Sequence, residues 1–476
     1  MMLEVLGMVK WAVLKHKGNK MKLNRRKLLQ QGMLLGGVIG SGKWLEKSAQ
    51  GHSQVYSKGN ECQWEREYTF GHTKLFMEEY YQGTLDILGA QSGELDQIGD
   101  LTSRAAKLIK AGGTVWASMD LGHMPHYELK EERRGNPGIM KSHATNLRAE
   151  RDFDHLKKGD IVFTHRANKG ALAARERGVY VVCVTSNYWH NEFRPAGYGA
   201  DDHWNPDGLM LGDVANEILH SHVPYEQGLV HVPQVPEFAV LPSSTTGTSI
   251  YWMLNAESAN KLANENAKEV DKSAQYLQIL TERVQRLKEQ YNQIRETAVI
   301  MAKKIRQGGR WFVKSIEHPG FESEFNVAQG IAVVNFGDWD ASKKKNIMLI
   351  TGISPAYPAE VKLALQKQID GAYVIGIGPS SMDSKVPHGR LIDIADAGFD
   401  NLSPESGGVI SVPGRTQTIC PTSGIVGNVI QQMIVAQWAD EMVRRGSVPY
   451  FLMGVYRKGG RAYNKAMRPF FELQGF

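Results

Sequence analysis

The sequence predicts an α/β protein that contains two copies of one domain, each a parallel sheet flanked by helices. Its 476 residues are enough for two to four domains. Short apolar runs such as 179–184 alternate with helical stretches, which is typical of βαβ units around a sheet covered on both faces. A series of landmarks also occurs twice in the same order, which indicates an internal duplication.

The landmarks of this repeat are short segments that match in pairs. In the first pair a helical stretch ends in two glycines, and an apolar strand follows. The five pairs, in chain order, are 105–116 with 302–312, 157–164 with 344–351, 178–185 with 371–378, 212–215 with 393–396, and 241–244 with 420–423.

The repeat divides the chain into predicted parts. Each copy opens with a helical segment, at about 74–111 and about 257–307, and the second of these has apolar residues at helical spacing. An aromatic segment without a counterpart follows the second copy, and we expect it to pack against the body of the protein. The predicted parts are an N-terminal segment 1–51, a first domain 74–256, a second domain 257–446 and a C-terminal tail 447–476.

The N-terminal segment carries the basic character of the chain. Its first fifty residues have ten Lys and Arg against two acids, a net charge of +8, so the remainder of this +6 chain carries −2. Because the body is not basic, the charge gives no reason to expect a nucleic-acid partner. The order of the segment, with Arg25 and Arg26 before a mildly apolar run 32–40, resembles a twin-arginine export signal.

This signal predicts a periplasmic or other extracytoplasmic location. The alternative is a basic, frayed N-terminus on a cytoplasmic protein. Met1 and Met21 are both possible starts of the chain. The apolar run is shorter than the ~20 residues that a membrane-spanning helix needs, and no other stretch qualifies, so we expect no membrane span.

Histidines gather in the first copy. Ten of the 15 lie between His123 and His231. Ligands of doubly wound sheets bind outside the carboxyl ends of the strands, so polar side chains that follow successive strands should meet at one edge. These residues are His123, His126 and Glu128 after the first predicted strand, His165 after the second, His190 after the third, and His220, His222 and Glu226 after the fourth.

Each copy resembles a SIS domain, the sugar-isomerase fold. The resemblance covers about 75–446. It depends on the double-glycine entry to the first strand, the run 175–186, and the Pro-Ser-Ser-Thr and Pro-Thr-Ser-Gly elements at 242–245 and 421–424. The first copy is closest to a bacterial subgroup with a Gly-His pair, here Gly122-His123, followed by a glutamate. The resemblance implies a five-stranded, flavodoxin-like parallel sheet in each copy and a sugar or sugar derivative as ligand.

Both copies depart from the family in one loop. SIS domains that bind phosphosugars carry the pattern S-x-S-G-x-T after the second strand, whereas 164–170 and 351–357 contain few hydroxyls. The ligand is therefore not expected to be a typical phosphosugar. Arg166 and Lys169 either hold an anionic group of the ligand or are solvated loop charges.

The resemblance also suggests catalytic residues. Aldose–ketose isomerisation needs a base that moves a proton between adjacent carbons and an acid/base group for ring opening. The candidates are Glu128 or Glu226 as the base, and His123 or His190 for ring opening. No cofactor is expected, although His123, His126, His190 or His222 could instead hold a metal.

Further residues are expected to bind the ligand. The hydroxyls at 243–245 and 422–423 have plain helix N-capping as their alternative. The full set is His126, His165, Arg166, Lys169, Ser186, His222, Ser243, Ser244, Thr245, Thr422 and Ser423.

Three functions remain open. The first is an exported isomerase of an unphosphorylated or acidic sugar, the second a non-catalytic protein that binds a carbohydrate derivative, and the third a metal-dependent lyase or hydrolase. SIS domains commonly associate in pairs, which the tandem supplies within one chain, and a homo-oligomer is also possible. If sites form between the copies, Glu317, His318 and Glu322 are further candidates.

Overall fold

A computed structural model describes residues 75–476 with internal gaps. The predicted export signal lies outside the described residues. The gaps are 120–132, 143–152, 186–207, 225–227, 236–238, 265–266, 268–270, 316–329, 333–335, 353–357, 381–388, 405–406 and 455–458.

The first copy contains a five-stranded sheet in which all strands are parallel, in the order β2-β1-β3-β4-β5. This is the strand order of flavodoxin-like folds. Its strands are β1 (Val115–Ser118), β2 (Lys141–Ser142), β3 (Ile161–Thr164), β4 (Tyr180–Val184) and β5 (Glu217–Leu219).

The second copy repeats this arrangement. Its described strands are parallel and ordered β11-β10-β9-β8, which corresponds to the first sheet without β2. The predicted fold class, two tandem parallel sheets flanked by helices, is therefore confirmed. The strands are β8 (Trp311–Ser315), β9 (Ile347–Thr351), β10 (Tyr373–Gly378) and β11 (Ala397–Asp400).

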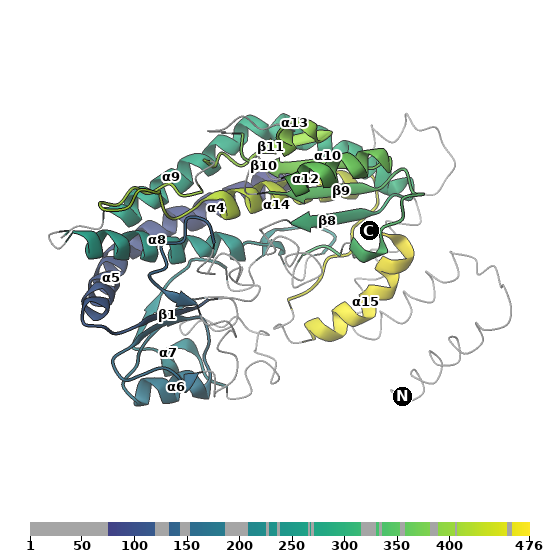
Figure 1. Ribbon diagram of the computed structural model, residues 1–476. Coiled ribbons are helices and arrows are strands. Elements are labelled where there is room, and N and C mark those ends of the chain that lie inside the picture. Colours follow the sequence, from purple (N-terminus) through teal and green to yellow (C-terminus); the bar gives the residue numbers. More distant parts are fainter. Residues whose placement is uncertain are drawn as a thin grey trace, which may run out of the picture. The chain divides into compact units, whose positions relative to one another are not determined.

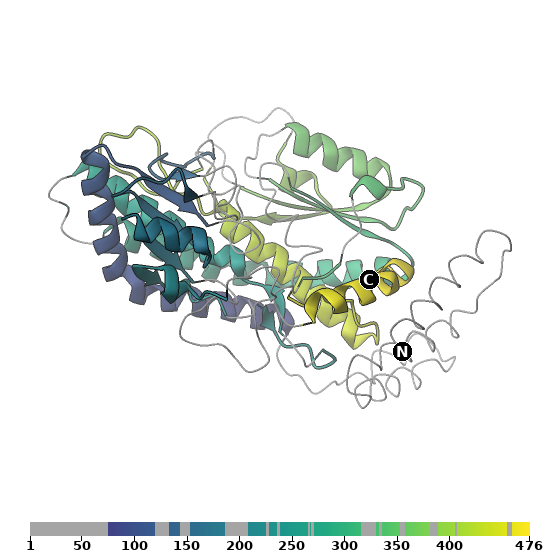
Figure 2. The ribbon, with the colours of Figure 1, turned by 90° about the horizontal axis from the view of Figure 1, so that it is seen from below.

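Six long helices cover the inner faces of both sheets and share one hydrophobic core with them (Figures 1 and 2). Three belong to each copy. They are α4 (Phe76–Gln91), α5 (Leu95–Lys110) and α8 (Ser244–Ala263) in the first copy, and α9 (Lys272–Arg286), α10 (Tyr291–Arg306) and α14 (Ser423–Arg444) in the second.

The helices pack with an approximate two-fold relation. In the first copy α5 packs on α8, and in the second copy α10 packs on α14. Between the copies, α4 of the first packs on α14 of the second, and α9 of the second packs on α8 of the first. Each copy thus buries the other's last helix, and α14 is buried almost all round. Because α8 continues to Ala263, the connection between the copies begins after that residue, beyond the predicted boundary at 256.

The double glycines end the corresponding helices α5 and α10 as predicted. Gly112 and Gly308 have φ of 82° and 91°, the left-handed conformation that glycine adopts without a steric cost. The amides of the next residues, Gly113 and Gly309, donate back to carbonyls of the last helical turn at 3.0 and 2.9 Å. The chain then enters β1 and β8.

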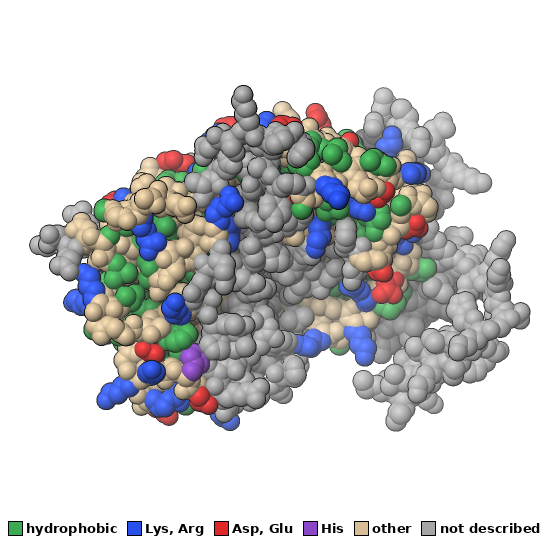
Figure 3. All heavy atoms as spheres, viewed as in Figure 1, with side chains coloured by type: hydrophobic (Ala, Val, Ile, Leu, Met, Phe, Trp, Pro, Cys, Tyr) green, Lys and Arg blue, Asp and Glu red, His purple; other side chains and the backbone are tan. Residues whose placement is uncertain are grey.

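Smaller helices cover the outer face of each sheet and close separate cores. Basic and acidic side chains are interspersed over the described surface that Figure 3 shows, rather than gathered by sign. No helix in the described ranges is long and apolar enough to cross a membrane. The outer helices are α6 (Lys169–Glu176) and α7 (Leu211–Val214) in the first copy, and α12 (Pro358–Ile369) and α13 (Leu391–Ile394) in the second.

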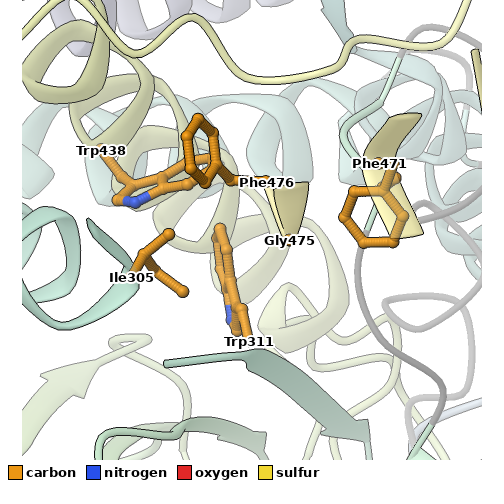
Figure 4. Close-up of a pocket in the computed structure, with 7 residues that line it drawn as sticks. Ile305, Trp311, Trp438, Phe471, Gly475 and Phe476 are labelled. Atoms are coloured by element: carbon orange, nitrogen blue, oxygen red, sulfur yellow. The ribbon is translucent and has the colours of Figure 1, made fainter. Parts of the chain in front are cut away.

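The C-terminal tail packs on the second copy, as predicted. Phe451 forms an antiparallel bridge with Ile331, and α15 (Gly460–Gln474) follows. Phe471 and the last residue, Phe476, lie near Ile305 and the edge-to-face pair Trp311 and Trp438, whose ring centroids are 5.1 Å apart (Figure 4). Burial of these aromatic rings stabilises the tail on the body.

Candidate functional site

The carboxyl edge of the first sheet carries polar residues after three neighbouring strands. His165 and Arg166 follow β3, Thr185 follows β4, and His220 to His222 follow β5. The structure therefore brings the described members of the predicted set to one edge. His123, His126, Glu128, Ser186, His190 and Glu226, together with Glu317, His318 and Glu322, lie outside the described residues.

His222 forms a pair with a carboxylate that the sequence analysis did not identify. Its Nε2 lies 2.8 Å from Oε1 of Glu94, in the short helical turn that joins α4 to α5. The other carboxylate oxygen of Glu94 accepts the backbone N–H of His220 at 3.2 Å. The His222 side chain is 31% exposed and that of Glu94 12%, so the imidazole is reachable from solvent while its partner is largely covered.

A chain of buried hydrogen bonds fixes the loop that carries His222. The Ser221 hydroxyl donates to the Thr185 carbonyl at 2.6 Å, and the Ser221 amide donates to the Thr185 hydroxyl at 2.9 Å. Gln91 of α4 donates to the Ser221 carbonyl at 2.8 Å and accepts from Ser249 of α8. The loop is thereby tied to one strand and two helices.

The backbone at His222 is strained. Its φ is 58°, a left-handed conformation that non-glycine residues seldom adopt and that accumulates at functional sites. Four non-glycine residues in the described ranges have a positive φ, and they form two repeat-related pairs: His222 with Leu402, and Leu241 with Cys420. Both copies therefore keep the same unusual backbone at the carboxyl edge.

The side chains at this shared backbone differ between the copies. Where the first copy has His222, the second has Leu402, and where it has Glu94, the second has Gln290. Gln290 keeps the structural contact, because its side chain accepts the backbone N–H of Asp400 at 3.1 Å as Glu94 accepts that of His220. The pair with acid/base capability is thus specific to the first copy, which agrees with the uneven distribution of histidines.

The two cationic candidates after β3 have different environments. Arg166 is only 5% exposed, and its backbone N–H donates to the Thr164 hydroxyl at 3.1 Å. Lys169 is an exposed residue in the first turn of α6, which Asn168 caps. Of the two candidate cations, Arg166 is thus the buried one and Lys169 the exposed one. His165, beside Arg166, is also buried.

The hydroxyl residues at the starts of α8 and α14 are buried and do not act as plain N-caps. Neither Ser243 nor Thr422 accepts a capping hydrogen bond from its own helix. Thr245 is also buried, and the structure does not describe the side chain of Ser244. The Thr422 hydroxyl instead accepts a short hydrogen bond from Arg283 of α9.

Ser423, the next residue, contacts the first copy. Its hydroxyl accepts a hydrogen bond of 3.0 Å from Arg133, which follows β1. No sequence signal marks Arg133, Arg283 or Glu94 directly, because they lie away from the repeat landmarks. The alignment of Glu94 with the neutral Gln290 is a signal that could have identified the first copy's carboxylate.

Metal-binding clusters and reactive thiols are the other chemical groups to consider in the described residues. No group of three or more His, Cys, Asp or Glu side chains there is placed to hold a metal ion. Burial raises the pKa of the Cys183 thiol and that of the Cys420 thiol, which keeps both groups protonated. Both cysteines therefore act as small core residues.

Comparisons with known proteins give partial matches. No family model matches the sequence. A UPF0309 protein of Shouchella clausii is 30% identical over 131 residues, which cover 26% of this chain and 53% of the relative. A UPF0309 protein of Geobacillus thermodenitrificans is 27% identical over 126 residues, 25% of this chain and 51% of the relative. The chain thus spans about half the length of the curated relatives it matches.

Solved structures align over more of the chain but at low identity. A crystal structure from Silicibacter pomeroyi, provisionally assigned as a phosphosugar isomerase, covers 77% of this chain and 98% of its own, with 14% identity and a TM-score of 0.43. One from Clostridium difficile with the same provisional assignment covers 79% and 96%, with 9% identity and a TM-score of 0.45. A provisionally assigned sugar binding protein from Salmonella typhimurium covers 75% and 98%, with 11% identity and a TM-score of 0.40.

Proposed function

We propose that the first copy is a sugar-isomerase site that binds a sugar or sugar derivative at the carboxyl edge of its sheet. The observation that carries this proposal is the hydrogen bond between His222 and Glu94. It supplies an oriented imidazole at the edge where doubly wound folds bind their ligands, and the equivalent positions of the second copy hold Leu402 and Gln290. The depleted hydroxyl loop favours a ligand other than a typical phosphosugar.

The Glu94 carboxylate prepares His222 for proton transfer. A carboxylate accepts hydrogen bonds, so the Nε2 of His222 donates to it and Nδ1 carries the lone pair. Nδ1 can then take a proton from a sugar hydroxyl and return it to the ring oxygen, which opens the ring. The base that moves the proton between adjacent carbons is Glu128 or Glu226, with His123 or His190 as a further acid/base group.

The position of Arg166 suggests an anionic feature of the ligand. Arg166 follows β3 at this edge, and a guanidinium can donate paired hydrogen bonds to a carboxylate. An acidic sugar, with a carboxylate in place of a phosphate, meets this requirement and agrees with the depleted loop. The His165 imidazole next to it is a further hydrogen-bonding group at the same edge.

The test is turnover of a panel of neutral and acidic aldoses and ketoses by the purified protein. We expect interconversion of one aldose–ketose pair, and a decrease of about 10²- to 10⁴-fold in kcat for the variant that removes the base, Glu128→Gln or Glu226→Gln. His123→Ala should slow the ring-opening step. Saturable binding of a sugar with no turnover by the wild type would instead establish the non-catalytic binding protein.

We also propose that the protein is exported through its twin-arginine-like segment. Replacing Arg25 and Arg26 together by lysine keeps the charge but removes the paired arginines. We expect the wild type in the periplasmic fraction of a bacterial host and the double variant in the cytoplasm, as measured by fractionation and immunoblotting. A wild-type protein found only in the cytoplasm would refute the export proposal.

A further inference from the structure

Two arginines from different copies meet at the start of α14. Arg133 comes from the first copy and donates to the Ser423 hydroxyl at 3.0 Å, while Arg283 comes from α9 of the second copy and donates to the adjacent Thr422 hydroxyl. The two side chains therefore contact adjacent residues of the chain, one each. The equivalent position in the first copy is the start of α8. It has no such pair of arginines, because Ile87 of α4 stands where Arg283 stands in α9.

The main chain fixes Arg133 against the second copy. The amide of Cys420 donates to the carbonyl of Gly135 at 2.8 Å, which joins the Arg133 loop to the strained residue before Pro421. Gly135 lies so close to Pro421 that an added Cβ would be 3.2 Å from the proline ring. Arg133 itself is only 3% exposed, so its guanidinium is held in this position out of water.

Arg283 forms no direct ion pair within the described residues. Its hydrogen-bond partner is the neutral Thr422 hydroxyl, and the Asp400 carboxylate acts on it only through space. Burial lowers the pKa of Arg283 from its ordinary value, which is the effect of withdrawing a cation from water, and Asp400 offsets part of this effect. A partly buried cation without a direct ion pair is costly, and a bound anion would lower that cost.

A buried amide on α14 points to the same conclusion. Asn428 is fully buried, and neither atom of its amide group has a hydrogen-bond partner in the part of the chain that the structure describes. Its repeat equivalent, Ser249, bonds to Gln91 at the end of α4. The residue that corresponds to Gln91 is Leu287, one helical turn after Arg283. By this correspondence the Asn428 amide is expected to face the end of α9, where a ligand could satisfy it.

From these contacts we infer that the second copy holds a separate binding site for an oxyanion-bearing small molecule, between Arg133 of the first copy and Arg283 of the second. Carboxylate, sulfate and phosphate groups share the required chemistry, since each accepts paired hydrogen bonds from guanidinium groups. The Thr422 and Ser423 hydroxyls and the first amides of α14 would add neutral donors. The site joins both copies and does not depend on the His222–Glu94 pair.

Titration calorimetry on the full chain, at constant ionic strength, tests this inference with inorganic phosphate and sulfate as probes, since neither is a sugar that the first copy would take as its ligand. We expect saturable binding of at least one probe, weakened about 10- to 100-fold in Arg283→Gln and in Arg133→Gln, since a hydrogen bond to a charged group contributes about 1.5–3 kcal/mol. The probe that binds most tightly identifies the anionic group. Arg283→Lys, which keeps the charge, should retain part of the affinity.

The matched control is Arg286→Gln on the same helix, because the Arg286 side chain is 56% exposed and pairs with Glu289. It should leave the affinity within about twofold of the wild type. Three results would overturn the inference: no saturable binding of any probe, an equal loss in Arg286→Gln, or a melting temperature lowered by Arg283→Gln with unchanged affinity. Loss of probe binding in His222→Gln would also overturn it, by placing the anion in the first copy.

Discussion

Replacing His222 by glutamine should lower kcat/KM about 10²- to 10⁴-fold for the sugar that the wild-type protein converts. Glutamine can still hydrogen-bond to Glu94, but it cannot accept and return a proton, and general acid–base catalysis contributes an effect of this size. Glu94→Gln should have a smaller effect, about 10- to 100-fold, because it leaves the imidazole in place and removes only the carboxylate that orients it. Steady-state kinetics of the purified variants measure both effects.

The first copy offers a close control for this pair. Nδ1 of His231 lies 2.7 Å from Oε1 of Glu79, but the His231 side chain is 79% exposed. His231→Gln therefore removes an imidazole from a second His–Glu pair that lies on the surface, and it should leave kcat/KM within about twofold of the wild type. Equal losses in His222→Gln and His231→Gln, or a kcat/KM unchanged in His222→Gln, would exclude His222 from the chemistry.

Alanine at Gly228 or at Gly408 should destabilise the protein by about 3 kcal/mol or more. The two glycines occupy equivalent positions in the copies, each on a short antiparallel pairing that precedes α8 or α14. An added Cβ would lie 2.2 Å from the Ala239 carbonyl oxygen at the first position and 2.3 Å from the Thr418 carbonyl at the second. A backbone carbonyl cannot rotate away from the added Cβ as a side chain can. The destabilisation is therefore expected at the upper end of the range that overpacking causes.

Chemical denaturation measures this effect, with Gly89→Ala as the control. Gly89 lies in α4, and an alanine Cβ there would meet nothing within 4 Å. That substitution should raise the free energy of unfolding by about 0.5–1 kcal/mol, because alanine favours the helix. Similar losses at Gly228 and Gly408 are expected if the copies share one architecture. A Gly408→Ala variant as stable as the wild type would show that Gly408 does not lie this close to the Thr418 carbonyl.

Much of the fold could be predicted because it depends on local patterns. Apolar strand runs and the double glycines before β1 and β8 identified the strands and their order along the chain, since a left-handed helix end requires glycine. Matching landmarks then showed that the second sheet repeats the first. The packing of each copy's last helix against the other copy could not be predicted from such a pattern. The reason is that α8 and α14 are buried on nearly all sides and lack a distinct polar face.

The candidate site was predicted only in part. His165 and His222 follow β3 and β5, at the edge where the carboxyl ends of parallel strands lie, and their role in a site stays a prediction. Their partners could not be found in this way. Glu94 lies 128 residues before His222 in the chain, and Arg133 lies 290 residues before Ser423. Such contacts depend on how the helices and the two copies pack, which no local pattern records.

The most direct test of the account is the exchange of a substrate proton with solvent. An isomerase that moves a proton between adjacent carbons through a side-chain base releases part of it to water, so the wild-type protein in D2O should place deuterium on carbon 2 of its sugar, as measured by NMR. His222→Gln should abolish this exchange on the same time scale, and His231→Gln should not. A sugar that binds to the wild type without gaining deuterium or being converted would contradict the proposal that the first copy is an isomerase site.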